Sequence, residues 1–353
     1  MRTDERTINR ATPAYVIAEI GHNHQGNLET AKELIIAAKY AGASAVKFQK
    51  RNNRSLYTDS FFDKPYASEN SYAPTYGLHR EFLEFNHDQF KVLVDFCKTL
   101  GITFLCTPFD CDSVDFLEDF DVPGYKIASG DITNIQLIKY VAKLQKPMFL
   151  STGACEEREL EIAEQVLNEY NPGNYCLLHC VAQYPAKARN LNLKIIERFL
   201  RIFPPNVVIG YSSHDLGKLA PTVAYLLGAT VIEKHFTINR AWKGTDHKMS
   251  LEADDLRKLI RDLRRLDEML GTDKKKLNDY ELPARQLMGK SIYVSAPISA
   301  GEEFSPNNIC LKTPADPKGL SPLWLPIVLS GKSRQSLSEG ELVLRSHVEK
   351  TDE

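Results

Sequence analysis

Short apolar segments alternate with longer amphipathic segments along roughly the first 270 residues of the chain. Residues 14–20 form an apolar run of strand length, and residues 28–41 follow with leucine, isoleucine and alanine on one helical face. Further strands are predicted near residues 44–49, 102–106, 125–128, 147–151, 175–180, 207–210 and 231–233. Further helices are predicted near residues 88–100, 111–120, 134–145, 157–170, 193–203, 216–228 and 253–270.

The number and spacing of these units predict a (β/α)8 barrel. Eight strand–helix units match the usual size of this fold, about 250 residues, and its active sites lie on the loops that follow the strands. An open doubly wound α/β sheet is the competing architecture. It is disfavoured because no Gly-x-Gly-x-x-Gly motif follows any predicted strand.

One segment interrupts the alternation. Residues 50–87 contain many aromatic and polar side chains, and we predict neither a strand nor a helix there. Loops of this length inside a compact domain are usually functional. The sequence leaves two roles open for this segment, a lid over a binding site and a contact between subunits.

The composition changes after Gly271. Residues 272–287 form a charged connector that is rich in lysine, and β-type runs at 291–294 and 342–344 follow, separated by proline and glycine. The sequence therefore predicts a barrel domain over 1–271, a linker over 272–287 and a small, mostly β domain over 288–353.

Charge and composition argue against several classes of partner. The 44 basic and 46 acidic residues leave a net charge of −2, which gives no reason to expect nucleic acid or an anionic membrane surface as partner. The polar start MRTDERTINR is unlike a signal peptide, and no apolar run approaches transmembrane length. The seven cysteines form no Cys-x-x-Cys motif, and their odd number favours reduced thiols. We therefore expect a cytoplasmic protein.

Two histidines follow neighbouring predicted strands. His214 comes after the run at 207–210, and His235 comes after the run at 231–233. Parallel strands joined by a crossover helix place both imidazoles at the same end of the sheet. Neutral imidazole is a common metal ligand, so one interpretation is a divalent metal held by His214 and His235. The other interpretation is two ordinary histidines that cap a sheet.

Polar side chains also follow the other predicted strands. Lys47 alternates with Val46 and Phe48, so it points to the opposite face, which in a barrel is the interior. Two lysines near several hydroxyl groups suit an anion that carries both phosphate and carboxylate. The polar mouth is expected to include Glu19, His22, Lys47, Gln49, Thr107, Lys126, Ser129, Asp131, Ser151, Tyr184, Ser212, His214, Glu233, His235 and Asp246.

Seven short motifs along the chain resemble those of the sialic acid synthase family. They are AEIGHNHQG (18–26), VKFQK (46–50), YKIASGD (125–131), LSTG (150–153), IGYSSH (209–214), EKHFT (233–237) and WKGTDH (242–247). The resemblance implies a (β/α)8 barrel followed by an antifreeze-like (SAF, β-clip) domain. It implies an enzyme that condenses phosphoenolpyruvate with N-acetylmannosamine or its 6-phosphate. It also implies a homodimer in which the antifreeze-like domain covers the partner's active site.

The resemblance implies a role for each matching residue. His214 and His235 match two ligands of Mn²⁺ or Mg²⁺, and Asp131 matches a carboxylate that assists proton movements at C2 of the intermediate. Glu19 and Lys47 join these three as the implied catalytic group. The implied phosphoenolpyruvate contacts are Lys47, Gln49, Thr107, Lys126, Ser129, Ser151 and Ser212. The implied sugar contacts are Glu19, Asn70, Tyr184 and Asp246.

Two positions depart from the pattern of bacterial family members. Ala182 stands where they tend to have Asn. Thr313 stands where many have an Arg that reaches a neighbouring subunit's site and contacts the N-acyl group of the sugar. The acceptor is therefore open between N-acetylmannosamine, its 6-phosphate, mannose 6-phosphate and a modified sugar that leads to legionaminic or pseudaminic acid.

Three further functions compete with this interpretation. A related phosphoenolpyruvate-dependent synthase that makes an octulosonate has the same kind of barrel mouth. A metal-dependent barrel hydrolase is a different class of enzyme, and additional protein ligands on the metal are the feature that favours it. A non-catalytic sugar- or ice-binding protein built around the C-terminal domain leaves the polar barrel mouth unexplained.

Overall fold

Eight parallel strands close into a barrel in the computed structural model of this chain, which describes residues 1–3 and 6–350. Around the ring the order is β10, β3, β4, β5, β6, β7, β8 and β9. The closed ring confirms the predicted (β/α)8 barrel and excludes the open doubly wound sheet. The strands are β3 (Tyr15–Glu19), β4 (Ala45–Lys50), β5 (Thr103–Pro108), β6 (Tyr125–Ile127), β7 (Met148–Ser151), β8 (Tyr175–Cys180), β9 (Val208–Ser213) and β10 (Val231–His235).

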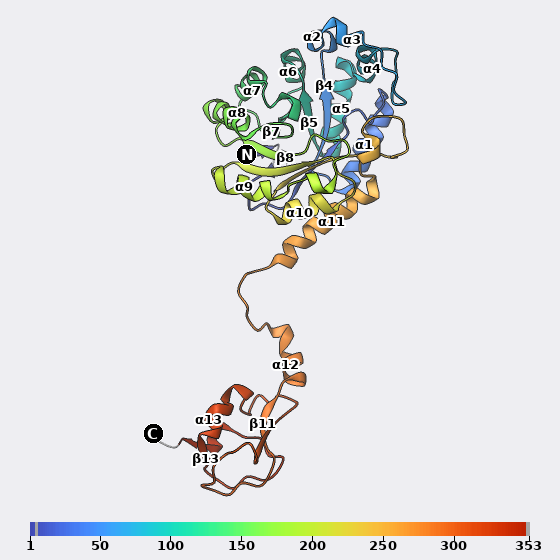
Figure 1. The fold of residues 1–353 in the computed structure, drawn as a ribbon. Coiled ribbons are helices and arrows are strands. Elements are labelled where there is room, and N and C mark those ends of the chain that lie inside the picture. The colour runs from blue at the N-terminus through green and yellow to red at the C-terminus, as the bar shows by residue number, and fades with distance from the viewer. Residues whose placement is uncertain (4–5, 351–353) are drawn as a thin grey trace. The chain divides into compact units, whose positions relative to one another are not determined.

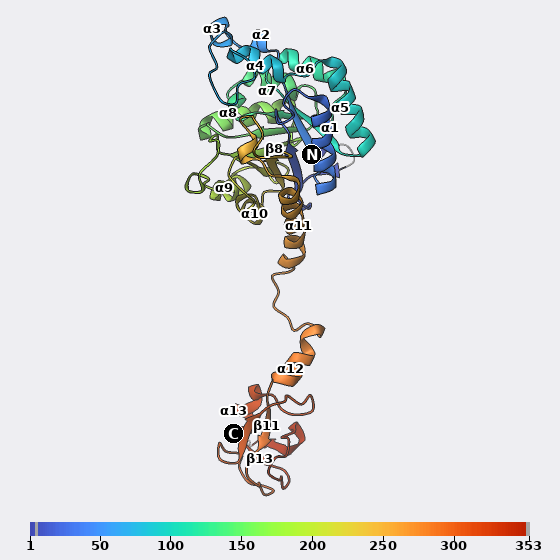
Figure 2. The same ribbon diagram turned by 90° about the vertical axis from the view of Figure 1, so that its right-hand side faces the viewer.

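Helices surround the ring, as Figures 1 and 2 show. At the start of α1 the Asn27 side chain accepts a hydrogen bond from the Thr30 amide, and Gly42 ends the helix with a φ of 94°.

Among the described residues no helix is both long and apolar enough to cross a bilayer. The helices are α1 (Leu28–Ala41), α5 (His87–Leu100), α6 (Cys111–Glu118), α7 (Ile135–Ala142), α8 (Glu157–Tyr170), α9 (Lys194–Ile202), α10 (Leu219–Leu226) and α11 (Ala253–Leu270).

Strand alternation divides the buried side chains into two clusters. Val46 and Phe104 point outward and belong to the large apolar cluster under the helices. Ile17, Leu105 and Phe149 point inward and form a second apolar cluster inside the ring. Toward the carboxyl ends of the strands the inward positions become polar, so the barrel is packed at one end and carries its chemical groups at the other.

The first residues of the chain contribute to the core inside the ring. β1 (Arg2–Thr3) pairs antiparallel with β2 (Arg6–Thr7). Ile8 follows, is only 1% exposed and joins the inner apolar cluster with Tyr15. The N-terminal segment therefore closes the amino end of the barrel, a role that its polar sequence did not suggest.

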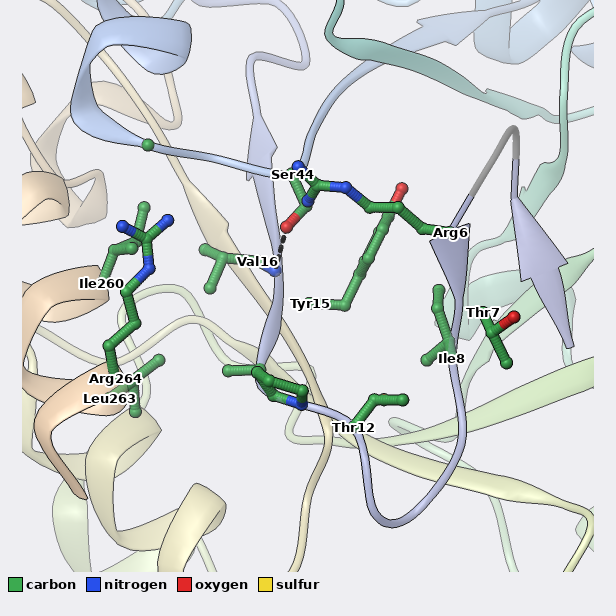
Figure 3. Close-up of a pocket in the computed structure, with 13 residues that line it drawn as sticks. Arg6, Thr7, Ile8, Thr12, Tyr15, Val16, Ser44, Ile260, Leu263 and Arg264 are labelled. Atoms are coloured by element: carbon green, nitrogen blue, oxygen red, sulfur yellow. Dashed lines mark hydrogen bonds between the residues drawn. The ribbon is translucent and has the colours of Figure 1, made fainter. Parts of the chain in front are cut away.

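A cavity of about 310 Å³ lies at this amino end, beside β3 (Figure 3). The N-terminal segment forms one side of it, and Ile260 and Leu263 of α11 form another. The Val16 amide donates a hydrogen bond to Ser44 Oγ across 3.3 Å, drawn as a dashed line in Figure 3. Active sites of this fold lie at the opposite end of the strands.

The segment at 50–87 is not the continuous loop that the sequence predicted. It contains three short helices, α2 (Asn53–Leu56), α3 (Asp59–Phe62) and α4 (Tyr76–Leu83), which lie beyond the end of β4 in Figure 1. Tyr76 is the centre of an aromatic cluster, with ring centroids 4.8 Å from Phe61 and 5.4 Å from Tyr57. These helices are too short for hydrophobic periodicity to reveal them.

The chain divides after Gly271 into two compact units, Met1–Gly271 and Thr272–Glu353. The second unit contains two antiparallel strand pairs and its own apolar core, which includes Ile292, Phe304 and Val343. Helix α12 (Leu282–Met288) begins inside the segment predicted as a linker. The remaining elements are β11 (Ser291–Val294), β12 (Ile309–Lys312), α13 (Leu325–Leu329), β13 (Gly331–Ser333) and β14 (Val348–Lys350).

One strand predicted in the second unit is wrong. The run at 342–344 is not a strand, because only Leu342 forms a single bridge, to Tyr293. Val343 is fully buried in the core, and its amide donates to the Ile292 carbonyl oxygen at 2.9 Å, so the run pairs with β11 over one bridge and does not extend into a strand. The antifreeze-like identity of this unit stays a prediction, and residues 351–353 of the predicted domain lie outside the described residues.

The packing of the N-terminal segment predicts the effect of a mutation. Ile8→Ala should lower the free energy of unfolding by about 2–4 kcal/mol, because it leaves a cavity in the inner cluster. Urea unfolding followed by circular dichroism measures this loss. The matched control is Ile36→Ala on α1, where Ile36 is 37% exposed and the expected loss is below about 1 kcal/mol. Equal losses in the two variants would show that the N-terminal segment does not stabilise the barrel.

Candidate active site

A cavity of about 490 Å³ lies inside the ring at the carboxyl ends of the strands. Most of the residues predicted from the sequence line it, and His22, Asn70 and Asp131 are the three that do not. The predicted residues in its wall are Glu19, Lys47, Gln49, Thr107, Lys126, Ser129, Ser151, Tyr184, Ser212, His214, Glu233, His235 and Asp246.

The register of the strands brings these residues together. Glu19 on β3 lies opposite Lys47 on β4, and Gln49 lies opposite Thr107 on β5. On the other side of β3, Glu19 lies opposite His235 on β10. Alternation points each of these side chains inward, so neighbours in the sheet become neighbours in the cavity.

Gly21 is required for the close packing around Glu19. Its φ is 52°, a conformation that residues with a side chain rarely adopt. A Cβ atom at this position would lie 2.9 Å from Glu19 Oε1 and 3.1 Å from Gln49 Nε2. Glycine therefore lets the chain turn away from β3 beside Glu19 without strain or a close contact.

Two lysines and two glutamates form a buried charge network. Lys47 Nζ lies 2.6 Å from Glu19 Oε2 and 3.8 Å from Glu233 Oε1. Lys126 Nζ lies 3.5 Å from the same Glu233 oxygen. All four side chains are at most 5% exposed, so water screens these charges little.

The network sets the ionisation of its members. Burial favours a low pKa for Lys47, but the charges of Glu19 and Glu233 outweigh it and raise the pKa. Burial favours a high pKa for Glu233, but Lys126 and Lys47 outweigh it and lower the pKa to about 2. For Lys126, burial dominates and lowers the pKa. Lys47 therefore stays cationic and Glu233 anionic at neutral pH.

Hydroxyl groups lie around the two lysines. Lys47 Nζ donates to Thr107 Oγ1 at 3.0 Å, and Ser212 Oγ donates to Glu233 Oε1 at 2.9 Å. Ser129 Oγ accepts a hydrogen bond from the Gly153 amide at 3.0 Å. Ser151 Oγ is buried, and we find no hydrogen-bond partner for it among the described residues. This wall can therefore offer ammonium and hydroxyl donors to an anion.

His214 and His235 lie side by side on the neighbouring wall, with ring centroids 5.4 Å apart. His214 Nδ1 lies 2.8 Å from the Val181 carbonyl oxygen, so this nitrogen carries the proton and Nε2 keeps a free electron pair. Burial, helped by His235, lowers the pKa of His214 to about 4, which keeps the ring neutral.

His235 completes the pair. Its Nδ1 is buried and forms no hydrogen bond among the described residues, although Asp246 Oδ2 lies 3.7 Å away. Two imidazoles with available electron pairs are a donor set that fits a divalent transition metal. Tyr184 borders the pair, with its ring centroid 4.1 Å from that of His214.

Asn70 and Asp131 lie beside the cavity wall. Asn70 Oδ1 accepts a hydrogen bond from the Gly244 amide at 3.0 Å, two residues before Asp246. Asp131 ends the short turn Ser129–Asp131, whose first two residues line the cavity, and its Oδ1 lies 3.3 Å from Asn134 Nδ2. Burial raises the pKa of Asp131.

Two cationic residues in the cavity wall, Arg51 and Arg80, were not predicted from the sequence. Arg51 continues the inward alternation of Lys47 and Gln49 past the end of β4, a signal that could have identified it. Arg80 lies on α4, and only the packing of that helix brings it to the cavity. No sequence pattern near Arg80 indicates this position.

Comparison with known proteins identifies the family. The chain matches the family model described as NeuB family over residues 34–275. It is 35% identical to N-acetylneuraminate-9-phosphate synthase of Mus musculus over 344 residues, which cover 98% of this chain and 95% of the relative. It is also 35% identical to N,N'-diacetyllegionaminic acid synthase of Legionella pneumophila over 342 residues, covering 95% and 94% of the two chains.

A solved structure agrees with both sequence matches. The N-acetylneuraminic acid (sialic acid) synthetase of Leptospira borgpetersenii, in complex with citrate, superposes with a TM-score of 0.68 at 30% identity. The match covers 80% of this chain and 95% of that one. The resemblance predicted from the seven motifs is thus confirmed, and the chain belongs to the NeuB family.

Proposed function

We propose that this protein is a nonulosonate synthase, which joins phosphoenolpyruvate to an aldehyde sugar and releases inorganic phosphate. The observation that carries the proposal is the single cavity in which buried Lys47 and Lys126 face the pair His214 and His235. Membership of the NeuB family supports it, since relatives in the family are synthases of N-acetylneuraminate 9-phosphate and of diacetyllegionaminate.

The lysine wall suits phosphoenolpyruvate. Lys47 and Lys126 supply ammonium N–H donors for its carboxylate and phosphate, and Thr107 and Ser151 supply directed hydroxyl donors. Ser212, whose hydroxyl donates to Glu233, lines the same wall. Gln49, which donates to Glu19 Oε1 at 2.7 Å, and Ser129 complete this wall. These donors can hold phosphoenolpyruvate in one orientation.

His214 and His235 would hold a divalent metal, Mn²⁺ or Mg²⁺. When bound, such a cation supplies Lewis acidity that favours addition to an aldehyde. Because the protein contributes two imidazoles, coordination positions remain for substrate and water. We place the acceptor sugar beside this pair, between Glu19, Tyr184 and Asp246, with Asn70 supporting the loop that carries Asp246.

The reaction is balanced by one water molecule. C3 of phosphoenolpyruvate attacks C1 of the open-chain sugar, a carbon–carbon bond forms as the aldehyde π bond opens, the aldehyde oxygen takes up a proton, and positive charge develops at C2. Water adds to C2 and loses one proton, which replaces the proton taken up by the aldehyde oxygen. The C2–O bond to phosphate then breaks, and the remaining hydroxyl proton passes to the leaving phosphate, which leaves a 2-keto acid and inorganic phosphate. Burial raises the pKa of Asp131, which supports its role in accepting a proton from this water.

The acceptor itself is to be identified by assay. Phosphate release from phosphoenolpyruvate with Mn²⁺ is measured with N-acetylmannosamine, N-acetylmannosamine 6-phosphate, mannose 6-phosphate and a diacetamido sugar in parallel. Release with at least one of these sugars supports a nonulosonate synthase, and release with none contradicts it. A homodimer in which the second unit covers the partner's cavity stays a prediction.

The histidine pair predicts a loss of both metal binding and activity. His214→Ala should reduce phosphate release at least about 100-fold, because it removes one of two protein ligands. Calorimetric titration of the free protein with Mn²⁺ should show weaker binding. His87→Ala is the matched control, because the His87 side chain is 52% exposed at the start of α5. Unchanged Mn²⁺ affinity in His214→Ala would overturn the assignment.

The lysine wall predicts a change in the KM for phosphoenolpyruvate. Lys126→Met should raise this KM about 10- to 100-fold, because a buried charge-assisted contact is lost. The control Lys194→Met removes an exposed lysine on α9 and should leave KM within about twofold. Steady-state kinetics at saturating sugar measure both. An increase in the KM for the sugar alone would contradict the assignment of Lys126 to the phosphoenolpyruvate contacts.

A further inference from the structure

Two guanidinium groups line the active-site cavity beyond the groups assigned to phosphoenolpyruvate. Arg51 follows β4 and is 7% exposed, and Arg80 comes from α4. Arg51 stacks on the Phe109 ring at 3.6 Å, and its Nη2 donates to Gln49 Oε1 at 2.7 Å. Both arginines are thus held in place.

His22 joins the two arginines. Arg51 Nη1 lies 3.1 Å from His22 Nε2, and Arg80 Nη1 lies 3.0 Å from His22 Nδ1. Tyr76 OH accepts two further bonds from Arg80, at 3.1 and 2.9 Å. His22, Arg51 and Arg80 therefore form one cluster, which we call the guanidinium cluster.

The guanidinium cluster contains more donors than acceptors. Burial, then the charges of Arg51 and Arg80, lower the pKa of His22 well below its usual value, so the ring is neutral. A neutral imidazole accepts at one nitrogen and donates at the other, whereas arginine only donates. In one of the two contacts with His22, an arginine N–H group therefore faces the N–H group of the imidazole, which cannot accept a hydrogen bond. A ligand made of acceptor oxygens would remove this conflict.

The charges of the guanidinium cluster are not balanced as those of the lysines are. Glu19 and Glu233 compensate Lys47 and Lys126. Near the cluster Glu84 contacts Lys50 at 3.1 Å and Arg51 at 3.8 Å. Arg80 forms no ion pair among the residues that the structure describes, although the charge of Asp246 acts on it. An excess of positive charge therefore remains on this wall.

The guanidinium cluster adjoins one end of the lysine wall, because Arg51 contacts Gln49, which lies on the same strand as Lys47. Its residues follow β3 and β4 or come from α4, whereas Lys126, Ser151 and Ser212 come from β6, β7 and β9. In the ring, β3 and β4 are separated from β7 by β5 and β6 on one side and by β8, β9 and β10 on the other. Two anionic groups can therefore occupy the cavity at once.

We propose that Arg51 and Arg80, positioned by His22, bind the phosphate monoester of a phosphorylated acceptor sugar. This inference rests on the proposed function and specifies its substrate class. Two guanidinium groups present forked N–H pairs that match phosphate oxygens, and a neutral sugar hydroxyl cannot compensate their charge. The sugar lies with its aldehyde toward His214 and His235 and its phosphate at the guanidinium cluster.

The wild-type enzyme gives the first test. Its kcat/KM for N-acetylmannosamine 6-phosphate should exceed that for N-acetylmannosamine at least about 100-fold, because a site built for a charged group rejects an analogue that lacks it. The same comparison with mannose 6-phosphate and mannose should favour the phosphorylated sugar. Equal or greater use of the unphosphorylated sugars overturns the guanidinium cluster as a phosphate site and leaves the synthase function intact.

A matched pair of variants gives the second test. Arg80→Met should reduce the preference for the phosphorylated sugar about 10- to 100-fold, and Arg80→Lys should restore part of it. Arg54→Met is the control, because Arg54 lies in the same segment, pairs with Glu81 at 3.0 Å and is 65% exposed in its side chain. A preference that is unchanged in Arg80→Met contradicts the proposal.

Binding separates this proposal from the proposed function. Calorimetric titration with mannose 6-phosphate and with mannose, without phosphoenolpyruvate, tests the guanidinium cluster even where no sugar supports phosphate release. Tighter binding of mannose 6-phosphate, lost by about tenfold or more in Arg80→Met, supports the phosphate site. Equal affinity for the two sugars overturns it, whatever the result of the activity assay.

Discussion

Side-chain alternation in a closed ring of parallel strands is the constraint on which this site depends. Because inward positions repeat every second residue, Ile17 and Glu19 on one strand share a face but serve different ends of the barrel. The apolar half excludes water and packs to a solid core. The polar half stands on the same rigid strands, so its charged groups are held in place by strands and not by loops.

Rigid placement makes the buried charges useful. In a solvent-poor cavity, Lys47 and Lys126 would lose their protons or their positions without Glu19 and Glu233. Removing one partner of such a network leaves an uncompensated buried charge, which is costly. Glu233 also lies two residues from His235, and Glu19 lies opposite it in the sheet. The charge network therefore ties the lysine wall to the histidine pair.

The sequence predicted what alternation and strand ends determine, and it missed what tertiary packing determines. Lys47, His214 and His235 lie where periodicity placed them, because a strand's geometry is local. Arg80 reaches the cavity only because α4 packs against the barrel, and Ile8 enters the core only because the N-terminal segment closes the amino end. Val343 shows the converse error, since an apolar run can serve a small core without forming a strand.

Under the proposed function with a phosphorylated acceptor, two anionic substrates repel each other in one cavity, and the layout of this barrel bears on that problem. In the proposed arrangement, the donors for phosphoenolpyruvate lie on strands from β4 to β9, and the donors for the sugar phosphate follow β3 and β4 or come from α4. The histidine pair lies at the carboxyl ends of β9 and β10. In this proposed arrangement the anionic ends are kept apart while the uncharged reacting carbons approach near the histidines. Binding energy from both remote anions can thus bring the carbons together without placing like charges at the bond that forms.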